Sequence, residues 1–242
     1  MHMGGTALHQ AVQKVISKGS AIAAHLLQTD ASQVSFNSGR FTVSGSERGI
    51  DLLALAEAAR DPANLPANWP GGMTPGLDAD AYNDSDLFTF PNGCHTAEVE
   101  IDTETGAVTL ERYFAIDDYG RLINPMLTTG QVQGGVAQGV GQALLEHTVY
   151  DGQSGQLLSG SFTDYTLPRA DDLPPLDITL AELPTSVNQL GVKGAGQAGC
   201  MAAPQTVINA ILDALAPLGI AHIDMPATPE RVWRAIQDAR HD

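Results

Sequence analysis

Apolar residues recur at helical spacing in several segments of the chain. In residues 130–147, Val132, Val136 and Val140 stand four positions apart, which predicts a helix with one apolar face. Similar apolar spacing predicts helices over residues 6–28, 47–60 and 201–215, and Thr228 followed by Pro229 marks the start of a last helix.

Strands are indicated where apolar and polar residues alternate. Val99 and Ile101 alternate with acidic residues, and Val108 and Leu110 alternate after a turn, so residues 95–118 are predicted to form a hairpin. A second hairpin is predicted at residues 34–43, further strands at 157–165 and 176–183, and a bulge or a change of face at Arg112, which interrupts the alternation.

A proline-rich segment at residues 61–93 shows no such periodicity. It contains five prolines, and long connections of this kind are typical of binding loops or linkers. Its aspartates suggest a calcium-binding loop of the EF-hand type starting at Asp78. Such a loop needs glycine where Asn83 stands and glutamate where Thr89 stands. We therefore interpret the acidic run as a solvated loop.

Composition limits the function classes. The 242 residues include 12 Lys and Arg against 28 Asp and Glu, and the net charge of -16 argues against binding to nucleic acid or an anionic membrane. Cys94 and Cys200 are too few for a disulfide framework, which favours a cytoplasmic location. No membrane-spanning apolar run or export signal is present, so no membrane span is expected.

The helix predicted at residues 130–147 is unusually rich in glycine. Each interior glycine costs about 0.8–1 kcal/mol relative to alanine, so another interaction must offset the loss. Helical spacing predicts a groove without side chains, open to a neighbouring backbone or a flat ligand, although close helix packing alone would also explain it. The groove glycines are Gly134, Gly135, Gly139 and Gly141, and the neighbouring amides are Gln131, Gln133 and Gln138.

A second glycine-dense stretch, residues 190–199, leads directly into the helix predicted at 201–215. Lys193 and Gln197 flank its opening, where backbone amides could face an anion. Gly194, Gly196 and Gly199 spell G-x-G-x-x-G, but the preceding residues are mostly polar and only 43 residues follow. A dinucleotide-binding Rossmann domain would need an apolar strand before the turn and much more chain after it.

These motifs together resemble the C-terminal part of the large subunit of molybdenum hydroxylases, the family of xanthine dehydrogenase, aldehyde oxidase and aerobic carbon monoxide dehydrogenase. The resemblance covers nearly the whole chain in order. It is carried by residues 98–106, Asn124-Pro125, 130–135, Gln138-Gly139, 191–199, 202–204 and 223–233.

The resemblance implies an α+β molybdopterin-binding domain over residues 1–242, with the loop 61–93 internal to it. It implies molybdopterin with molybdenum, often as the cytosine dinucleotide, for hydroxylation of a small substrate such as an aldehyde or N-heterocycle. Fe-S and FAD would lie on partner chains. The implied cofactor-binding residues are Gln131, Gly134, Gly135, Gln138, Lys193, Gly194 and Gly196, and no metal ligand is implied.

The chain departs from the family pattern in two respects. Gln197 occupies the position of the family's general-base glutamate, and a neutral amide cannot accept a proton. The chain also corresponds to about the last third of a family large subunit, so we expect it to need an upstream molybdopterin-binding chain or domain. The alternative is a non-catalytic remnant or scaffold domain, which Gln197 favours.

Overall fold

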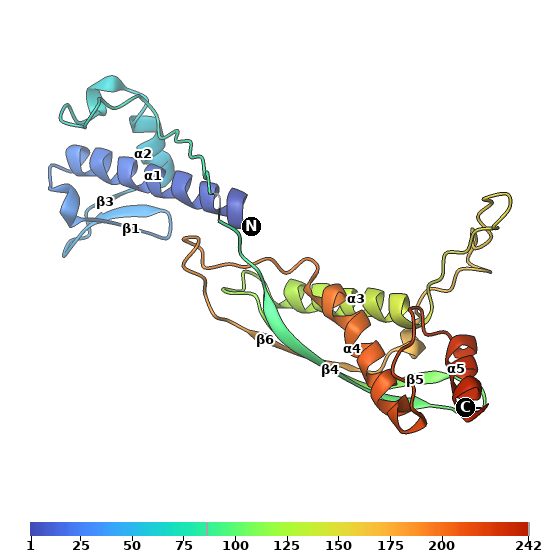
Figure 1. Ribbon diagram of the computed structural model, residues 1–242. Helices are drawn as coiled ribbons and strands as arrows, with labels where there is room; N and C mark the ends of the chain where they lie inside the picture. Colours follow the sequence, from blue (N-terminus) through green and yellow to red (C-terminus); the bar gives the residue numbers. More distant parts are fainter. Residues whose placement is uncertain (86, 242) are drawn as a thin grey trace. The chain divides into compact units, whose positions relative to one another are not determined.

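The computed structural model describes residues 1–85 and 87–241 and contains two compact units, Met1–Asp86 and Leu87–Asp242 (Figure 1). Each unit has its own hydrophobic core. The prediction of a single domain over residues 1–242 stays a prediction. None of the described helices combines the length and the apolar character needed to cross a membrane.

The first unit places two helices against a small antiparallel sheet with strand order β1-β2-β3. Ile22, Phe41 and Leu55 are fully buried at its centre. Phe41 packs directly on the first helix at Gly19, where a Cβ would lie 2.5 Å from the ring. The elements are α1 (His2–Leu26), β1 (Val34–Asn37), β2 (Arg40–Val43), β3 (Gly49–Asp51) and α2 (Leu52–Ala58).

The predictions for the first unit are largely confirmed. The hairpin at residues 34–43 turns at Ser38 and Gly39, which both have positive φ. The helix predicted over residues 47–60 begins only at Leu52, because Gly49–Asp51 pairs with β2 as a third strand. In its described residues, the proline-rich loop contains one 3-10 turn, Pro62–Asn64, before β4 begins.

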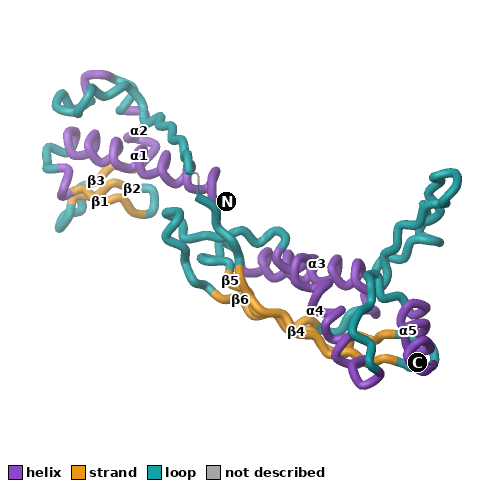
Figure 2. The backbone as a smooth tube through the Cα atoms, in the orientation of Figure 1, coloured by secondary structure: helices purple, strands orange, loops and turns teal. Residues whose placement is uncertain are grey.

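The second unit is built on a three-stranded mixed sheet of order β4-β5-β6, in which β4 is antiparallel and β6 parallel to β5 (Figure 2). Its two long helices, α3 and α4, pack against each other, and α4 also packs on β4. The elements are β4 (Asn92–Ile101), β5 (Val108–Asp118), α3 (Pro125–Leu144), β6 (Leu176–Ala181), α4 (Ala198–Leu215) and α5 (Pro229–His241). The α+β prediction is confirmed.

The long hairpin contains the predicted bulge. Glu98 pairs with Arg112 while Val99 pairs with Leu110, so Glu111 is the extra residue. The strand predicted at residues 176–183 is β6, and the last helix begins at Pro229, where Thr228 Oγ1 accepts the Arg231 N–H at 3.4 Å.

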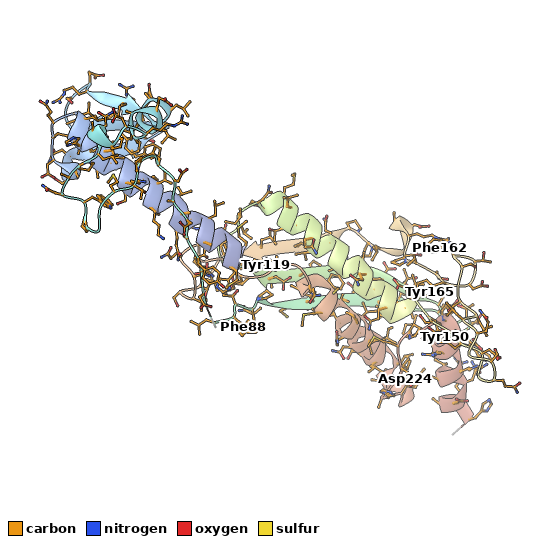
Figure 3. The ribbon with its side chains drawn as sticks, turned by 90° about the horizontal axis from the view of Figure 1, so that it is seen from above. Phe88, Tyr119, Tyr150, Phe162, Tyr165 and Asp224 are labelled. Atoms are coloured by element: carbon orange, nitrogen blue, oxygen red, sulfur yellow. The ribbon has the colours of Figure 1, made fainter. Side chains whose placement is uncertain are left out.

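The prediction of a strand at residues 157–165 is wrong. This segment lies in the long loop between α3 and β6, which projects away from the sheet in Figure 1, and Leu157 forms only an isolated bridge with Tyr150. Ser161 caps a turn instead, with its hydroxyl on Asp164 at 2.8 Å, and Phe162 is 83% exposed (Figure 3). Local serine turns therefore occupy the segment that was expected to form a strand.

Candidate functional site

The glycine turn before α4 is anchored to the end of β5. Lys193 N donates to Tyr119 O at 2.9 Å, and Gly120 forms an isolated antiparallel bridge with Val192. A Cβ on Gly120 would lie 2.2 Å from Gly191 O, so this approach requires glycine. Gly120 and Gly191 also have φ values of +65° and +69°, which glycine adopts readily. The turn therefore lies directly on the strand end.

Lys193 forms a buried ion pair at the base of the turn. Its Nζ contacts Asp118 Oδ2, and the two side chains are only 13% and 4% exposed. Asp118 Oδ1 accepts the backbone N–H groups of Gly120 at 2.8 Å and Leu183 at 3.0 Å. Burial by itself would raise the pKa of Asp118, but these hydrogen bonds and the lysine charge lower that pKa below its usual value. Asp118 thus ties the turn to β5 and to the segment after β6.

Gln131 connects α3 to the same turn. Its Nε2 donates to Gly196 O at 2.6 Å, across 65 residues of sequence. The start of α3 is set by Asn124, whose Oδ1 accepts the Leu127 N–H at 3.1 Å, with Pro125 in the first helical position. The structure therefore brings together two of the predicted cofactor-binding residues, Gln131 and Gly196.

Gln138 lies apart from this contact. It follows Gln131 by seven residues, which corresponds to about 10 Å along a helix axis. Its side chain is exposed, and among the described residues it makes no hydrogen bond to the turn. Gln138 stays a predicted cofactor contact.

The glycines of α3 have different surroundings. A Cβ on Gly135 would lie 2.9 Å from Cys200 N, and one on Gly139 would lie 2.6 Å from Ala203 Cβ, so both glycines permit close packing against α4. Gly199 on α4 makes the reciprocal contact, since its Cβ would lie 2.6 Å from Val132 O. Helix packing therefore accounts for Gly135 and Gly139, the explanation that the sequence left open beside ligand contact.

Gly134 of α3 and two glycines of the turn face open space, whereas a Cβ on Gly141 would lie 2.4 Å from Glu146 Oε1. No described atom, apart from those of the glycine and its own local backbone, would lie within 4 Å of a Cβ on Gly134, Gly194 or Gly196. All three residues are exposed, and packing gives no reason for the missing side chains. The exposed backbone of the turn and the open position on α3 leave room for a ligand to approach the main chain.

Gln197 is the N-cap residue of α4 and is exposed. Its side chain does not cap the helix, so the first-turn amides are not satisfied by it. Helix N-terminal amides next to an open glycine turn favour a polar or anionic ligand group. The arrangement can bind such a group through backbone donors, while Gln197 contributes an amide that hydrogen-bonds but takes no proton.

Sequence reasoning missed the carboxylates that support the site. The sequence predicts Asp117 and Asp118 only as the end of the hairpin, yet both are buried at the end of β5. Asp117 Oδ2 accepts from Tyr119 Oη at 2.9 Å and lies 3.0 Å from His95 Nε2, whose ring also contacts Tyr113 Oη at 2.7 Å through Nδ1. Two adjacent acids at the end of a predicted strand could have indicated these buried carboxylates. Buried charges need hydrogen-bond or ion-pair partners, so such acids are expected to make long-range contacts.

Comparisons with known proteins agree on one family. A family model described as "Molybdopterin cofactor-binding domain" matches residues 1–174. The nicotine 6-hydroxylase large subunit of Paenarthrobacter nicotinovorans is 36% identical over 96% of this chain, and the carbon monoxide dehydrogenase large chain of Hydrogenophaga pseudoflava is 33% identical over 98%. The chain spans only 28% and 29% of the lengths of these relatives.

A solved structure has the same fold. Carbon monoxide dehydrogenase from Oligotropha carboxidovorans is similar over 98% of this chain and 29% of its own, with a TM-score of 0.87 and 32% identity. At 98% coverage, this match extends beyond residues 1–174, which the family model covers. This chain therefore belongs to the molybdopterin cofactor-binding domain family of the molybdenum hydroxylases.

Proposed function

We propose that this chain forms part of the molybdopterin site of a molybdenum-dependent hydroxylase that oxidises a small substrate such as an aldehyde or N-heterocycle. The observation that carries the proposal is the exposed glycine backbone at Gly194 and Gly196, held to α3 by Gln131. The relatives named as nicotine 6-hydroxylase and carbon monoxide dehydrogenase support the reaction class.

The residues present fit such a cofactor. Open positions at Gly134, Gly194 and Gly196 admit a flat polar group, and the first-turn amides of α4 suit its anionic parts. Bound molybdopterin would supply the redox chemistry of oxidative hydroxylation. On this chain Gln131 and the glycine backbone would hold and orient the group, whereas Lys193 is directed to Asp118 and keeps the turn in place.

The proposed cofactor contacts are Gln131, Gly134, Gly135, Gln138, Gly194 and Gly196, and Lys193 would support them by holding the turn through its ion pair with Asp118. Gly135 would contribute through its backbone, because the space beside its Cα is filled by α4. Gln138 would contribute its amide further along α3. These contacts extend over both the turn and the helix, as a ligand with an extended polar framework requires.

Gln197 would limit the reaction in its present form. It stands at the position of the family's general base, and without a group that accepts a proton the rate falls by on the order of a hundredfold or more. A Gln197→Glu change in the assembled enzyme should raise kcat by that factor, with molybdenum content unchanged. A variant no more active than the wild type would contradict a base role at this position.

We further propose that the cofactor is the cytosine dinucleotide form and that electrons leave through partner subunits carrying Fe-S and FAD in the cytoplasm. Relatives are named as large subunits and as a subunit of a dehydrogenase complex. These names support the proposal that this chain functions within a multisubunit complex. The remaining molybdopterin contacts would come from an upstream molybdopterin-binding chain or domain, since this chain matches only about three-tenths of each relative.

Purification from the native source tests the proposal. We expect the chain to co-purify with the additional molybdopterin-binding polypeptide and with molybdenum, measured by mass spectrometry of the complex and by elemental analysis. A metal-free preparation with no such polypeptide would support the second candidate, a scaffold domain that keeps the fold without catalysis. Gln197 is the observation that favours this second candidate.

A further inference from the structure

The first half of β5 has a neighbouring strand on one side only. β6 pairs with β5 from Tyr113 onward, whereas β4 already pairs with it at Val108. Pro174 and Pro175 directly precede β6, and proline has no backbone N–H to donate to a neighbouring strand. The edge of β5 that β6 would otherwise cover is therefore open between Val108 and Arg112.

The backbone groups at this edge follow from the pairing in the hairpin. Asp102 N donates to Ala107 O at 2.9 Å, so these two residues form a hydrogen-bonded pair at the end of the ladder. Hydrogen-bonded and non-hydrogen-bonded pairs alternate along an antiparallel ladder. Thr109 is therefore bonded to β4, while the N–H and C=O groups of Val108 and Leu110 point away from β4.

Val108 and Leu110 have no replacement for the missing strand. Within residues 1–85 and 87–241, no group outside the β4–β5 ladder forms a hydrogen bond with the backbone of either residue. Leu110 is only 5% exposed. Because buried backbone groups are nearly always hydrogen-bonded, this edge lacks a partner that supplies both donors and acceptors.

A cavity of about 380 Å³ lies along the open edge. Residues 108–111 form one of its walls, and residues 171–174 form another. Val140 and Leu144 of α3 contribute apolar side chains that are 0% and 8% exposed. Cavities of about 300–1,000 Å³ hold small ligands, so this one has room for a few residues of extended chain.

The exposed residues around the cavity are acidic. Glu111, Asp171 and Asp172 all line it, and none of them takes part in an ion pair with a described residue. Apolar walls with an acidic rim are complementary to a ligand that carries positive charge beside apolar groups.

We propose that this open edge binds an extended, basic peptide segment of a partner protein by strand addition. The backbone of the segment bonds to Val108 and Leu110, its apolar side chains enter the cavity, and its Lys or Arg side chains lie at Glu111 and Asp171. Leu110 precedes Asp118 by eight residues, which is about 26 Å along a strand, so this surface is separate from the glycine turn. The interaction does not depend on the proposed binding of molybdopterin.

Hydrogen exchange of the full chain, measured by NMR, tests the edge directly. A saturating amount of the peptide acetyl-Lys-Val-Lys-Leu-Lys-amide should slow exchange at the amides of Val108 and Leu110 by at least about fivefold. The amide of Thr109, which is already bonded to β4, should not change. No slowing, or equal slowing at all three amides, would overturn the proposal.

Two altered peptides separate strand addition from simple charge attraction. The same peptide with an N-methylated backbone keeps its charges and side chains but cannot donate, so its Kd in calorimetric titration should be at least about tenfold higher. A peptide with Glu in place of Lys should bind at least about fivefold more weakly, because its charges meet the acidic rim. Equal affinities of the methylated and unmethylated peptides would contradict the proposal.

Asp171→Lys locates the site on the protein. It reverses a charge at the rim and should raise the Kd of the lysine peptide by at least about fivefold, whereas Asp213→Lys makes the same change on α4 away from the cavity and should not. Circular dichroism establishes that both variants are folded, and Glu111→Lys replaces Asp171→Lys if that variant is not. Unchanged binding to the folded rim variant would place the peptide elsewhere and sink the proposal.

Discussion

Asp118 links the glycine turn to residues far away in the sequence. One carboxylate joins Lys193, which is 75 residues away in sequence, to backbone amides of Gly120 and Leu183. Because the ion pair is buried, removing one partner leaves the other charge without compensation. The value of the pair therefore lies in keeping the turn in one conformation.

We expect Asp118→Asn to lower the free energy of unfolding by about 3–5 kcal/mol at pH 7, because the ammonium of Lys193 would stay buried without its counter-charge. Urea unfolding measures the change. Asp177→Asn on the exposed side of β6 is the matched control and should change stability by less than about 0.5 kcal/mol. Equal effects of the two changes would contradict a structural role for the ion pair.

The same carboxylate makes stability depend on pH. The pKa of Asp118 is lower in the folded than in the unfolded chain, so its contribution is present above the unfolded value of about 4 and is lost as pH falls through the folded value. The stability difference between wild type and Asp118→Asn should therefore shrink in acid.

Gln197 leads to a prediction about the helix that begins directly after it. A glutamate at this position would place a negative charge at the N-terminus of α4, so Gln197→Glu should stabilise the chain by about 0.3–1 kcal/mol at low salt. The gain should disappear at high ionic strength, as measured by urea unfolding in both buffers. Gln205→Glu, exposed in the third turn of α4, is the control, and an equal gain there would exclude a helix-terminus effect.

At the level of elements, the α3–α4 contact separates the glycines needed for packing from those that packing leaves unexplained. Gly139→Ala would bring its methyl group to 2.6 Å from Ala203 Cβ. It should therefore cost about 1–3 kcal/mol through overpacking. Gly134→Ala meets open space and should stabilise the helix by up to about 1 kcal/mol.

Thermal and urea unfolding of the two alanine variants measure this contrast. The functional readout is separate: in the assembled enzyme, Gly134→Ala should reduce molybdenum content if the open position faces the cofactor. A destabilised Gly134→Ala protein would contradict the open surroundings of that residue, whatever its metal content.

The hydrogen bond between α3 and the turn leads to a prediction about local order. Gln131→Ala removes the donor to Gly196 O, a bond worth about 0.5–1.5 kcal/mol, so the amides of residues 194–197 should exchange with solvent several-fold faster. Hydrogen exchange measured by mass spectrometry tests this expectation. Gln138→Ala on the same helix is the control, and equal acceleration in both variants would contradict a specific role for Gln131.

At the scale of the whole molecule, the two hydrophobic cores share no residue. Ile22, Phe41 and Leu55 belong to the core of Met1–Asp86, while Val136 and Val207 belong to that of Leu87–Asp242. A core that lies within one unit can form without the other. This organisation makes the folding of each unit directly measurable.

A protein of residues 87–242 should therefore fold alone, with near-UV circular dichroism and a cooperative thermal transition. We expect its Tm to lie within about 5 °C of the corresponding transition in the full chain. If residues 87–242 are unfolded by themselves, the two units depend on each other, as the single domain over residues 1–242 predicted from the sequence would require.

Much of the fold was predictable because it depends on local patterns. The spacing of Val132, Val136 and Val140 defined the helix that became α3, and the break at Arg112 located the bulge within one residue. Residues 157–165 show the limit of the method, because none of the described strands pairs with them. A strand needs a partner that its own sequence does not specify.

The sequence by itself determined the helices, the long hairpin, the two glycine-rich segments and the family. Each of these can be recognised from patterns within short stretches of consecutive residues. Only the tertiary structure decided which glycines serve packing and which are open, that Gln131 reaches Gly196, and that Asp118 holds Lys193. Those contacts join residues 65 and 75 positions apart. Local periodicity does not predict such contacts, since they form only when separate elements pack together.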